Sequence, residues 1–338
     1  MNITVLLGGA SAERDVSIAS GVRIIDALRS IGHEVTAADP STGAVGDDAE
    51  RSLRATHLRA EPPSLEELAR LGGRRRRGRA EFVPDLVTIP AVRDADVVFL
   101  ALHGGQGEDG TLQAILDTAG VRYTGSGHLA SALAMDKDLS KILFRAAGVG
   151  TPDWLMAPAD ESLVEDRLGF PVVVKPSKQG STVGLTLVKQ RGELAEAVAR
   201  AWQYDDEVML EEFVPGRELT VGVLGDHPLP VGEIFPTHEI YDYECKYTAG
   251  MAREEFPARL TSSESARVQD EAVRAFRALK LRGYARIDFR MGAAGQFYCL
   301  EANTLPGMTA LSLIPQAAAA CGLSFGALCE RIVQLAIG

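Results

Sequence analysis

The segment YARIDFRMGAAGQFYCLEANTLPGM, residues 284–308, holds the most informative group of chemically active side chains in the sequence. Two strand-like runs flank the turn at 292–295, which predicts an antiparallel hairpin over 284–303. In a register with an odd residue sum, one face of this hairpin carries Arg286, Asp288, Glu301 and Asn303. The opposite face is then predicted to pack into a core and carries Ile287, Phe289, Tyr298 and Leu300.

The polar face of this hairpin suits a metal ion. Hard cations such as Mg²⁺ take oxygen ligands and readily share them with nucleotide phosphates. Asp288, Glu301 and Asn303 are therefore candidate ligands, and Arg286 would lie beside them. A solvated polar face with a surface ion pair is the alternative, and the spacing alone leaves it open.

A second stretch, KPSKQGSTVG at 175–184, has the composition of an anion-binding loop. Lys175 ends an apolar strand, and the small and hydroxyl residues after it can point backbone N–H groups at phosphate oxygens. The loop lacks the GxxxxGK[ST] pattern of a Walker A motif, and a plain surface turn is the alternative. A second lysine, Lys137 in MDKDLSK, is by itself an ordinary helix-face lysine.

Two further glycine-rich turns follow predicted strands. In LGGASAERDVS, Glu13 precedes a helix that Asp15 or Ser17 would cap. In LHGGQGEDGTLQ, His103 and Glu108 lie at the carboxyl edge of a sheet, although a lone histidine after a strand can be purely structural. Neither turn is GxGxxG, so a dinucleotide-binding fold is a poor match.

The elements that must position these residues are predicted from hydrophobic periodicity. The first third alternates strands and helices in a βαβ order typical of a parallel sheet; its strands are expected at 2–7, 34–38 and 95–102, and its helices at 17–31 and 112–119. The middle third is expected to contain a helix at 126–148, a strand at 171–175, a helix at 191–202 and a strand at 207–213. The last third is expected to contain a strand at 217–223, a long loop near 236–256, a helix at 262–281, the hairpin and a final helix pair.

Composition limits the class of protein. With 338 residues, the chain is expected to form two or three domains that share one site. A formal net charge of -11 argues against general nucleic-acid binding and against attraction to anionic membranes. The first apolar run is too short for a signal peptide, and no run reaches the ~20 residues of a membrane helix. The four cysteines lack CxxC spacing, as expected of reduced thiols in a cytoplasmic enzyme.

Taken together, the motifs resemble a known family. GGASAERDVS, HGGQGEDGTLQ, TGSG, AMDK, VVVKPSKQGSTVG, YDYECKYTAG, RIDF and LEANTLPGMT occur in the order and spacing of D-alanine–D-alanine ligases, which belong to the ATP-grasp class. The resemblance covers essentially the whole chain except residues 40–93, where the run Arg74–Arg77 is interpreted as a solvated loop. It implies an α/β (α+β) fold of three domains, predicted at 1–116, 117–211 and 212–338, with ATP between the second and third.

The resemblance also implies roles for residues around the amino-acid substrates. Glu13 would bind the ammonium of the first D-alanine, with Ser181 and Tyr247 as its hydrogen-bonded partners. The other residues implied in substrate binding or catalysis are His103 near the first substrate, Arg286 and the Gly307 N–H at the tetrahedral intermediate, and Ser312 and Leu313 at the second carboxylate.

For ATP and metal ions, the resemblance implies a separate set of residues. Lys137, Lys175 and Lys246 would hold the phosphates, and Asp288, Glu301 and Asn303 would hold Mg²⁺ or Mn²⁺, two ions per site. The adenine and ribose contacts implied are Glu211, the backbone of Phe213 and Val214, and Glu218. A homodimer is usual in the family.

Substrate choice is the point that the sequence leaves most open. Relatives that make D-alanyl-D-lactate have a histidine where this chain has Tyr247, so an amine is expected as the second nucleophile. D-Serine or another amino acid as second substrate stays an alternative. A non-catalytic nucleotide-binding module is a rival of a different class, against which the complete set of metal ligands and lysines argues. Gln106, in place of a glycine, and the stretch 51–79 depart from the family pattern away from the chemical core.

Overall fold

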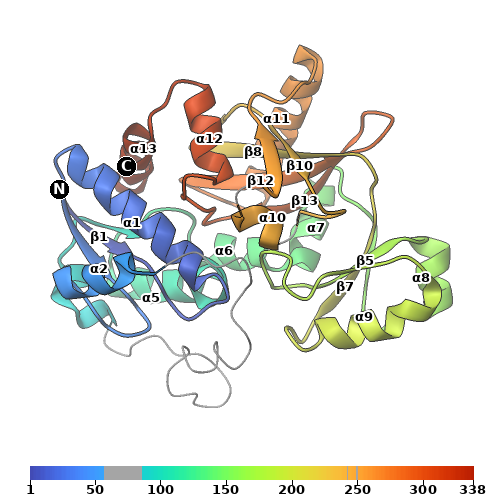
Figure 1. Cartoon of the computed structure of the whole chain (residues 1–338), viewed down its shortest axis with the longest axis horizontal. Coiled ribbons are helices and arrows are strands. Elements are labelled where there is room, and N and C mark those ends of the chain that lie inside the picture. The colour runs from blue at the N-terminus through green and yellow to red at the C-terminus, as the bar shows by residue number, and fades with distance from the viewer. Residues whose placement is uncertain (57–85, 242, 249) are drawn as a thin grey trace.

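The N-terminal part of the computed structural model contains a three-stranded parallel sheet (Figure 1). The structure describes residues 1–56, 86–241, 243–248 and 250–338, so the predicted loop at Arg74–Arg77 lies outside the described residues. The sheet has the order β2-β1-β3, formed by β1 (Asn2–Leu6), β2 (Glu34–Ala38) and β3 (Val97–Leu100). This confirms the parallel sheet expected from the βαβ pattern. Its helices and short helical turns are α1 (Arg14–Ser30), α2 (Asp47–Arg54), η1 (Leu86–Thr88), α4 (Pro90–Arg93), η2 (Gly105–Gly107) and α5 (Thr111–Ala119).

The predicted cap of the first helix is wrong. Helix α1 begins at Arg14, three residues earlier than expected, so Asp15 and Ser17 lie inside its first turn, whereas a capping side chain must stand before it. Ser17 instead accepts a hydrogen bond from the Gly8 N–H (2.8 Å) and donates one to the Ala101 carbonyl (2.8 Å). These bonds fix the first glycine-rich turn against the sheet.

The central part is an antiparallel sheet of order β4-β7-β5-β6. Its strands are β4 (Trp154–Met156), β5 (Val172–Pro176), β6 (Thr186–Val188) and β7 (Val208–Glu212), and its helical elements are α8 (Glu161–Arg167), η3 (Arg191–Glu193) and α9 (Leu194–Ala201). The single helix predicted over 126–148 is two helices, α6 (His128–Met135) and α7 (Lys137–Ala146). The break occurs because the Asp136 carboxylate caps α7 by accepting from the Leu139 N–H (3.0 Å).

The C-terminal part is built on a six-stranded sheet with the path β11-β10-β8-β12-β13, and β9 pairs with β8. The strands are β8 (Arg217–Leu224), β9 (His227–Pro228), β10 (Gly232–Pro236), β11 (Ala252–Glu255), β12 (Tyr284–Met291) and β13 (Phe297–Asn303), and the helices are α10 (Tyr243–Tyr247), α11 (Ser262–Ala278), α12 (Leu313–Ala320) and α13 (Phe325–Ile337). The expectation of a long loop near 236–256 is wrong in part, since this segment contains α10 and β11.

The predicted hairpin is confirmed, but its assignment of faces is wrong in one part. Asp288 pairs with Glu301 as expected, and the register then shifts at a β-bulge, so that Phe289 pairs with Cys299 and leaves Leu300 as the extra residue. The inner face therefore carries Ile287, Phe289, Met291, Phe297, Cys299 and Ala302, all in one core cluster. Tyr298 and Leu300 lie on the other side, and Leu300 lines a crevice.

The three sheets fall into the three predicted domain ranges to within one residue of each boundary. However, α6 and α7, which the prediction gave to the central domain, contribute Ala130, Ala134 and Phe144 to the core of the C-terminal sheet. The boundaries therefore stay predictions. Within the described residues no single helix has the length and apolarity to cross a membrane, and only the α12–α13 pair, bent by 105°, meets those criteria jointly.

Candidate active site

Two adjoining crevices contain almost all of the predicted site residues. The first lies between the central and C-terminal sheets and is lined by Lys137, Lys175, Glu211, Phe213, Val214, Glu218, Asp288 and Glu301. The second lies toward the N-terminal sheet and is lined by Glu13, His103, Arg286, Asn303, Gly307, Ser312 and Leu313. Ser181, Tyr241 and Lys246 line both crevices, so the two spaces meet at these side chains. The predicted Tyr247 belongs to α10, but its side chain lies outside the described part of the structure.

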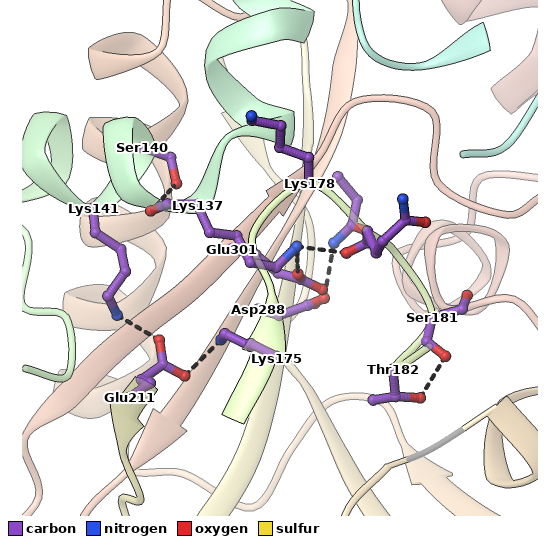
Figure 2. A network of polar contacts seen from close by, with 12 residues as sticks. Lys137, Ser140, Lys141, Lys175, Lys178, Ser181, Thr182, Glu211, Asp288 and Glu301 are labelled. Atoms are coloured by element: carbon purple, nitrogen blue, oxygen red, sulfur yellow. Dashed lines mark hydrogen bonds and ion pairs between the residues drawn. The ribbon is translucent and has the colours of Figure 1, made fainter. Parts of the chain in front are cut away.

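A buried chain of charges underlies the first crevice (Figure 2). One carboxylate oxygen of Glu211 accepts from Lys175 and the other from Lys141, both at 2.6 Å. Burial raises the pKa of Glu211, but the two lysines outweigh this effect and leave it below the ordinary value. Burial also lowers the pKa of Lys141 to about 8. Lys141 was not among the predicted site residues, although its i,i+4 spacing from Lys137 could have placed both lysines on one helix face.

Replacing Lys141 with methionine is expected to lower the free energy of unfolding by about 3 kcal/mol, because one oxygen of a buried carboxylate would lose its charged partner. Denaturant unfolding measures this. Lys189→Met is the matched control, since its ion pair with Glu239 is exposed and should contribute about 1 kcal/mol or less. Equal stability of the two variants would contradict the structural importance of Lys141.

The acidic hairpin faces the same crevice, where its ligand-type groups converge (Figure 2). Asp288 accepts from the Arg286 guanidinium (2.9 Å), from the Thr220 hydroxyl (2.7 Å) and from the Asn303 amide (3.0 Å). Glu301 lies directly opposite Asp288 and 3.3 Å from Lys137. The structure therefore brings together the three predicted metal ligands and the arginine.

Four basic side chains surround Glu301 in this cluster. Burial raises the pKa of Glu301, but the charges of Lys137, Lys246, Lys175 and Arg286 together bring it down to about 2. Asp288 and Glu301 raise the pKa of Arg286 against the effect of burial. Glu301 is thus a carboxylate at any physiological pH, as a ligand for a hard cation must be.

The loop after β5 closes the junction of the two crevices. Ser181 and Thr182 adopt left-handed backbone conformations with φ of 49° and 60°, which are uncommon for residues other than glycine. The Ser181 hydroxyl donates to the Glu13 carboxylate, and Lys137 donates to the Gln179 carbonyl (2.7 Å). The predicted pairing of Ser181 with Glu13 is therefore present.

Glu13 lies between Gly104, in the turn after β3, and Gly180, in the loop after β5. A Cβ atom at Gly104 would lie 2.8 Å from one Glu13 carboxylate oxygen, and a Cβ at Gly180 would lie 3.0 Å from it. Both turns approach the carboxylate closely because they lack side chains. The small residues of the two glycine-rich motifs thereby bring Glu13 into the second crevice.

His103, which is buried, and Glu108, which is half-buried, line the second crevice. Burial lowers the pKa of His103, and both of its ring nitrogens lie within hydrogen-bond distance of partners, Leu305 O (2.7 Å) and Ser20 Oγ (3.1 Å). Burial, together with the charge of Glu13, raises the pKa of Glu108 to about 7. Glu108 was noted at the sheet edge but was not assigned to the site; its position five residues after His103 in one turn could have indicated it.

The far end of the second crevice is formed by the segment between β13 and α12. A Cβ at Gly307 would lie 2.7 Å from the Ser312 hydroxyl, so this position excludes side chains. Ser312 accepts from the Thr309 N–H (2.9 Å), and Leu313 begins α12 as a buried residue. The crevice here has room for a small polar molecule beside Arg286.

Two antiparallel sheets that enclose a crevice lined by lysines and by an acidic hairpin define the ATP-grasp class of ligases. Two family models match the chain, "D-ala D-ala ligase N-terminus" over residues 2–126 and "D-ala D-ala ligase C-terminus" over residues 143–334. The chain belongs to the D-alanine–D-alanine ligase family.

Individual relatives agree with this assignment along the full chain. The sequence is 42% identical to a D-alanine–D-alanine ligase of Syntrophobacter fumaroxidans over 346 residues, covering 100% of this chain and 98% of the relative. The structure is similar to that of a Bacillus anthracis D-alanine–D-alanine ligase complexed with ATP (TM-score 0.77, 31% identity, 100% and 97% coverage). It is also similar to the Coxiella burnetii D-alanine–D-alanine ligase (TM-score 0.78, 28% identity, 99% and 93% coverage). The predicted fold and family are confirmed.

Proposed function

We propose that this chain joins two D-alanine molecules into D-alanyl-D-alanine, converts ATP to ADP and phosphate, and so supplies a peptidoglycan precursor. The observation that carries this proposal is the full-length match to a D-alanine–D-alanine ligase at 42% identity. The two crevices that meet at Ser181 and Lys246 support it, because the reaction needs a nucleotide and amino acids side by side. We also propose a cytoplasmic location, where ATP is present, and a homodimer.

The chemistry follows from the low reactivity of a carboxylate toward an amine at neutral pH. In the first step a carboxylate oxygen of one D-alanine attacks the γ-phosphorus of ATP, which gives D-alanyl phosphate and ADP. In the second step the amino group of the other D-alanine attacks the acyl carbon, loses a proton, and expels phosphate. The protein contributes mainly positioning and charge neutralisation.

The amino-acid end of the reaction is assigned to the second crevice. Glu13, held by Ser181, would bind the ammonium group of the first D-alanine, next to His103. Ser312 and Leu313 would surround the carboxylate of the second. Tyr247 would complete the Glu13 set and favour an amine nucleophile.

Residues at and beside the junction would neutralise the negative charges of the reacting groups. Lys137, Lys175 and Lys246 would bind the triphosphate, while Arg286 and the Gly307 N–H would stabilise the oxyanion of the tetrahedral intermediate. Such donors act most strongly where water is excluded. The junction is largely buried, which fits this requirement.

The acidic hairpin fits a divalent cation by the chemistry of its donors. Asp288 and Glu301 offer carboxylate oxygens and Asn303 an amide oxygen, the ligand types that Mg²⁺ or Mn²⁺ prefers. We propose that these residues hold two ions when ATP is bound. The ions would offset negative charge on the triphosphate.

The other end of the first crevice is assigned to the nucleoside. Glu211 would accept from the adenine amino group, the Phe213 and Val214 backbone would meet the ring edge, and Glu218 would accept from the ribose hydroxyls. Arg290 lines the same place and was missed from the sequence; it donates to the Val214 carbonyl (3.0 Å) and pairs with Glu218 (3.2 Å).

The direct test is amino-acid-dependent release of ADP. The chain with ATP, Mg²⁺ and D-alanine is expected to release ADP well above its rate with L-alanine or with no amino acid. D-Serine and D-lactate in the second position test the alternative second substrates. ATP binding without D-alanine-dependent ADP release would overturn the proposal in favour of a nucleotide-binding module.

A further inference from the structure

The segment 304–309, which leads from β13 toward α12 and contains Gly307, is held by side chains from the N-terminal part of the chain. From α1, the Ser20 hydroxyl accepts from the Met308 N–H (3.0 Å). The Arg23 guanidinium donates to the carbonyls of Met308 (3.1 Å) and Thr309 (2.6 Å). One helix thus binds three backbone groups immediately after Gly307.

The residues before Gly307 are held in the same way by the turn after β3. The Glu108 carboxylate accepts from the Leu305 N–H (3.1 Å) and lies 3.5 Å from the Thr304 hydroxyl. His103 is hydrogen-bonded to the Leu305 carbonyl (2.7 Å) and, through its other ring nitrogen, to Ser20 (3.1 Å). Ser20 therefore joins the two groups of contacts, and we call Ser20, Arg23, His103 and Glu108 the loop clamp.

The loop clamp leaves little freedom to the peptide that presents the Gly307 N–H. Backbone groups are bound two residues before Gly307 and directly after it, and Pro306 between them has a fixed φ. Arg23 is itself held, since its guanidinium lies 3.7 Å from the centre of the Phe325 ring of α13. The orientation of the Gly307 amide is thus determined by side chains outside the C-terminal sheet.

We propose that Ser20, Arg23 and Glu108 are positioning residues that orient the Gly307 N–H toward the reacting acyl group, an inference that rests on the proposed function. Glu13 directly precedes α1, the same helix that carries Ser20 and Arg23. Helix α1 therefore connects Glu13, which would bind the ammonium group of the first substrate, with the side chains that would orient the donor for the acyl oxygen of that substrate. A shift of α1 would move both groups together, which preserves their separation.

The test uses Arg23→Met in the full chain, with kcat and the KM values for ATP and D-alanine measured by ADP release. A misplaced donor can cost up to about 10²-fold in rate, so kcat is expected to fall at least about tenfold, with the KM for ATP changed less than about twofold. Arg23→Lys should restore part of kcat, because its ammonium can donate to the same carbonyls. Hydrogen exchange of the peptide containing residues 304–309 should become faster in Arg23→Met.

The matched control is Arg267→Met. Arg267 makes the same kinds of contact at the turn of the β12–β13 hairpin, donating to the Gly295 carbonyl (2.5 Å) and lying 4.9 Å from the centre of the Phe297 ring. This variant should keep the parent kcat. If Arg23→Met does not fold, Ser20→Ala, which removes one acceptor and little volume, takes its place with the same expectations.

Three outcomes would count against the inference, and they are distinguishable. A parent-like kcat in a folded Arg23→Met would overturn the clamp alone. Equal losses of kcat in the Arg23 and Arg267 variants would assign both arginines a general structural role. No D-alanine-dependent ADP release by the unaltered chain would overturn the proposed function and, with it, the catalytic meaning of the clamp.

Discussion

Replacing Arg286 with methionine is expected to lower kcat by about 10²–10³-fold, the usual effect of removing one oxyanion donor. The guanidinium lines the second crevice, is 14% exposed, and donates to both oxygens of Asp288. It is therefore a fixed positive charge where the acyl oxygen is expected to become negative. Steady-state ADP release with saturating ATP and D-alanine measures the effect.

ATP affinity should change much less than turnover in the same variant. Asp288 keeps its bonds from the Thr220 hydroxyl (2.7 Å) and the Asn303 amide (3.0 Å), so its orientation does not depend on Arg286 alone. Calorimetric titration with ATP and Mg²⁺ checks this. Arg253→Met is the control, because that arginine forms an exposed pair with Glu255 on the same sheet. Turnover within about threefold of the parent would remove Arg286 from the mechanism.

Replacing Glu301 with glutamine is expected to have the second large effect, because it weakens metal binding and lowers kcat. The change keeps the shape of the side chain but removes a charge that Lys137, Lys246 and Lys175 hold in the ionised form. We expect a loss of about 3 kcal/mol of transition-state stabilisation, roughly 100-fold in kcat, and a higher Mg²⁺ concentration for half-maximal activity.

When no metal is present, the expected effect of this substitution is on ATP binding and has the opposite sign. Without a divalent cation, Glu301→Gln should bind ATP at least as tightly as the parent, because the negative triphosphate no longer meets a carboxylate there. Glu196→Gln, on the exposed face of α9, is the control and should behave as the parent in both assays. Unchanged Mg²⁺ dependence in Glu301→Gln would exclude this residue as a ligand.

The sequence predicted the parts of the fold that follow from local periodicity. The strands of the parallel sheet and the hairpin were placed within a few residues because apolar spacing and glycine turns mark them, and the final helix pair was expected in the correct order, without bounds. The helix break at Asp136 was missed because both halves are apolar on one face, and only the capping bond to Leu139 separates them. Element α10 was missed because five residues are too few for a periodic signal.

Site residues were predictable where a sequence motif contains them. They were not predictable where only tertiary packing brings them to the site. Glu13 and Ser181 lie 168 residues apart in sequence, and the family motifs indicated their contact, which the structure contains. Arg23 gave no signal, since an arginine on a helix usually faces solvent, and its carbonyl partners are 285 and 286 residues away. Such contacts depend on how separate sheets pack together, which local spacing does not encode.

The bulge at Leu300 also limits how the gene for this chain can change length. Upstream of the extra residue, Cys299 faces inward, and downstream of it Glu301 faces the crevice. Loss of the Leu300 codon would remove the extra residue and restore strict alternation, with Cys299 still facing inward and Glu301 still facing the crevice. Loss of the Tyr298 codon would instead rotate part of the strand by half a turn, so that either Phe297 or Cys299 would leave the apolar interior. A one-residue deletion at the bulge is therefore compatible with the fold of this strand, whereas a deletion two residues earlier is not.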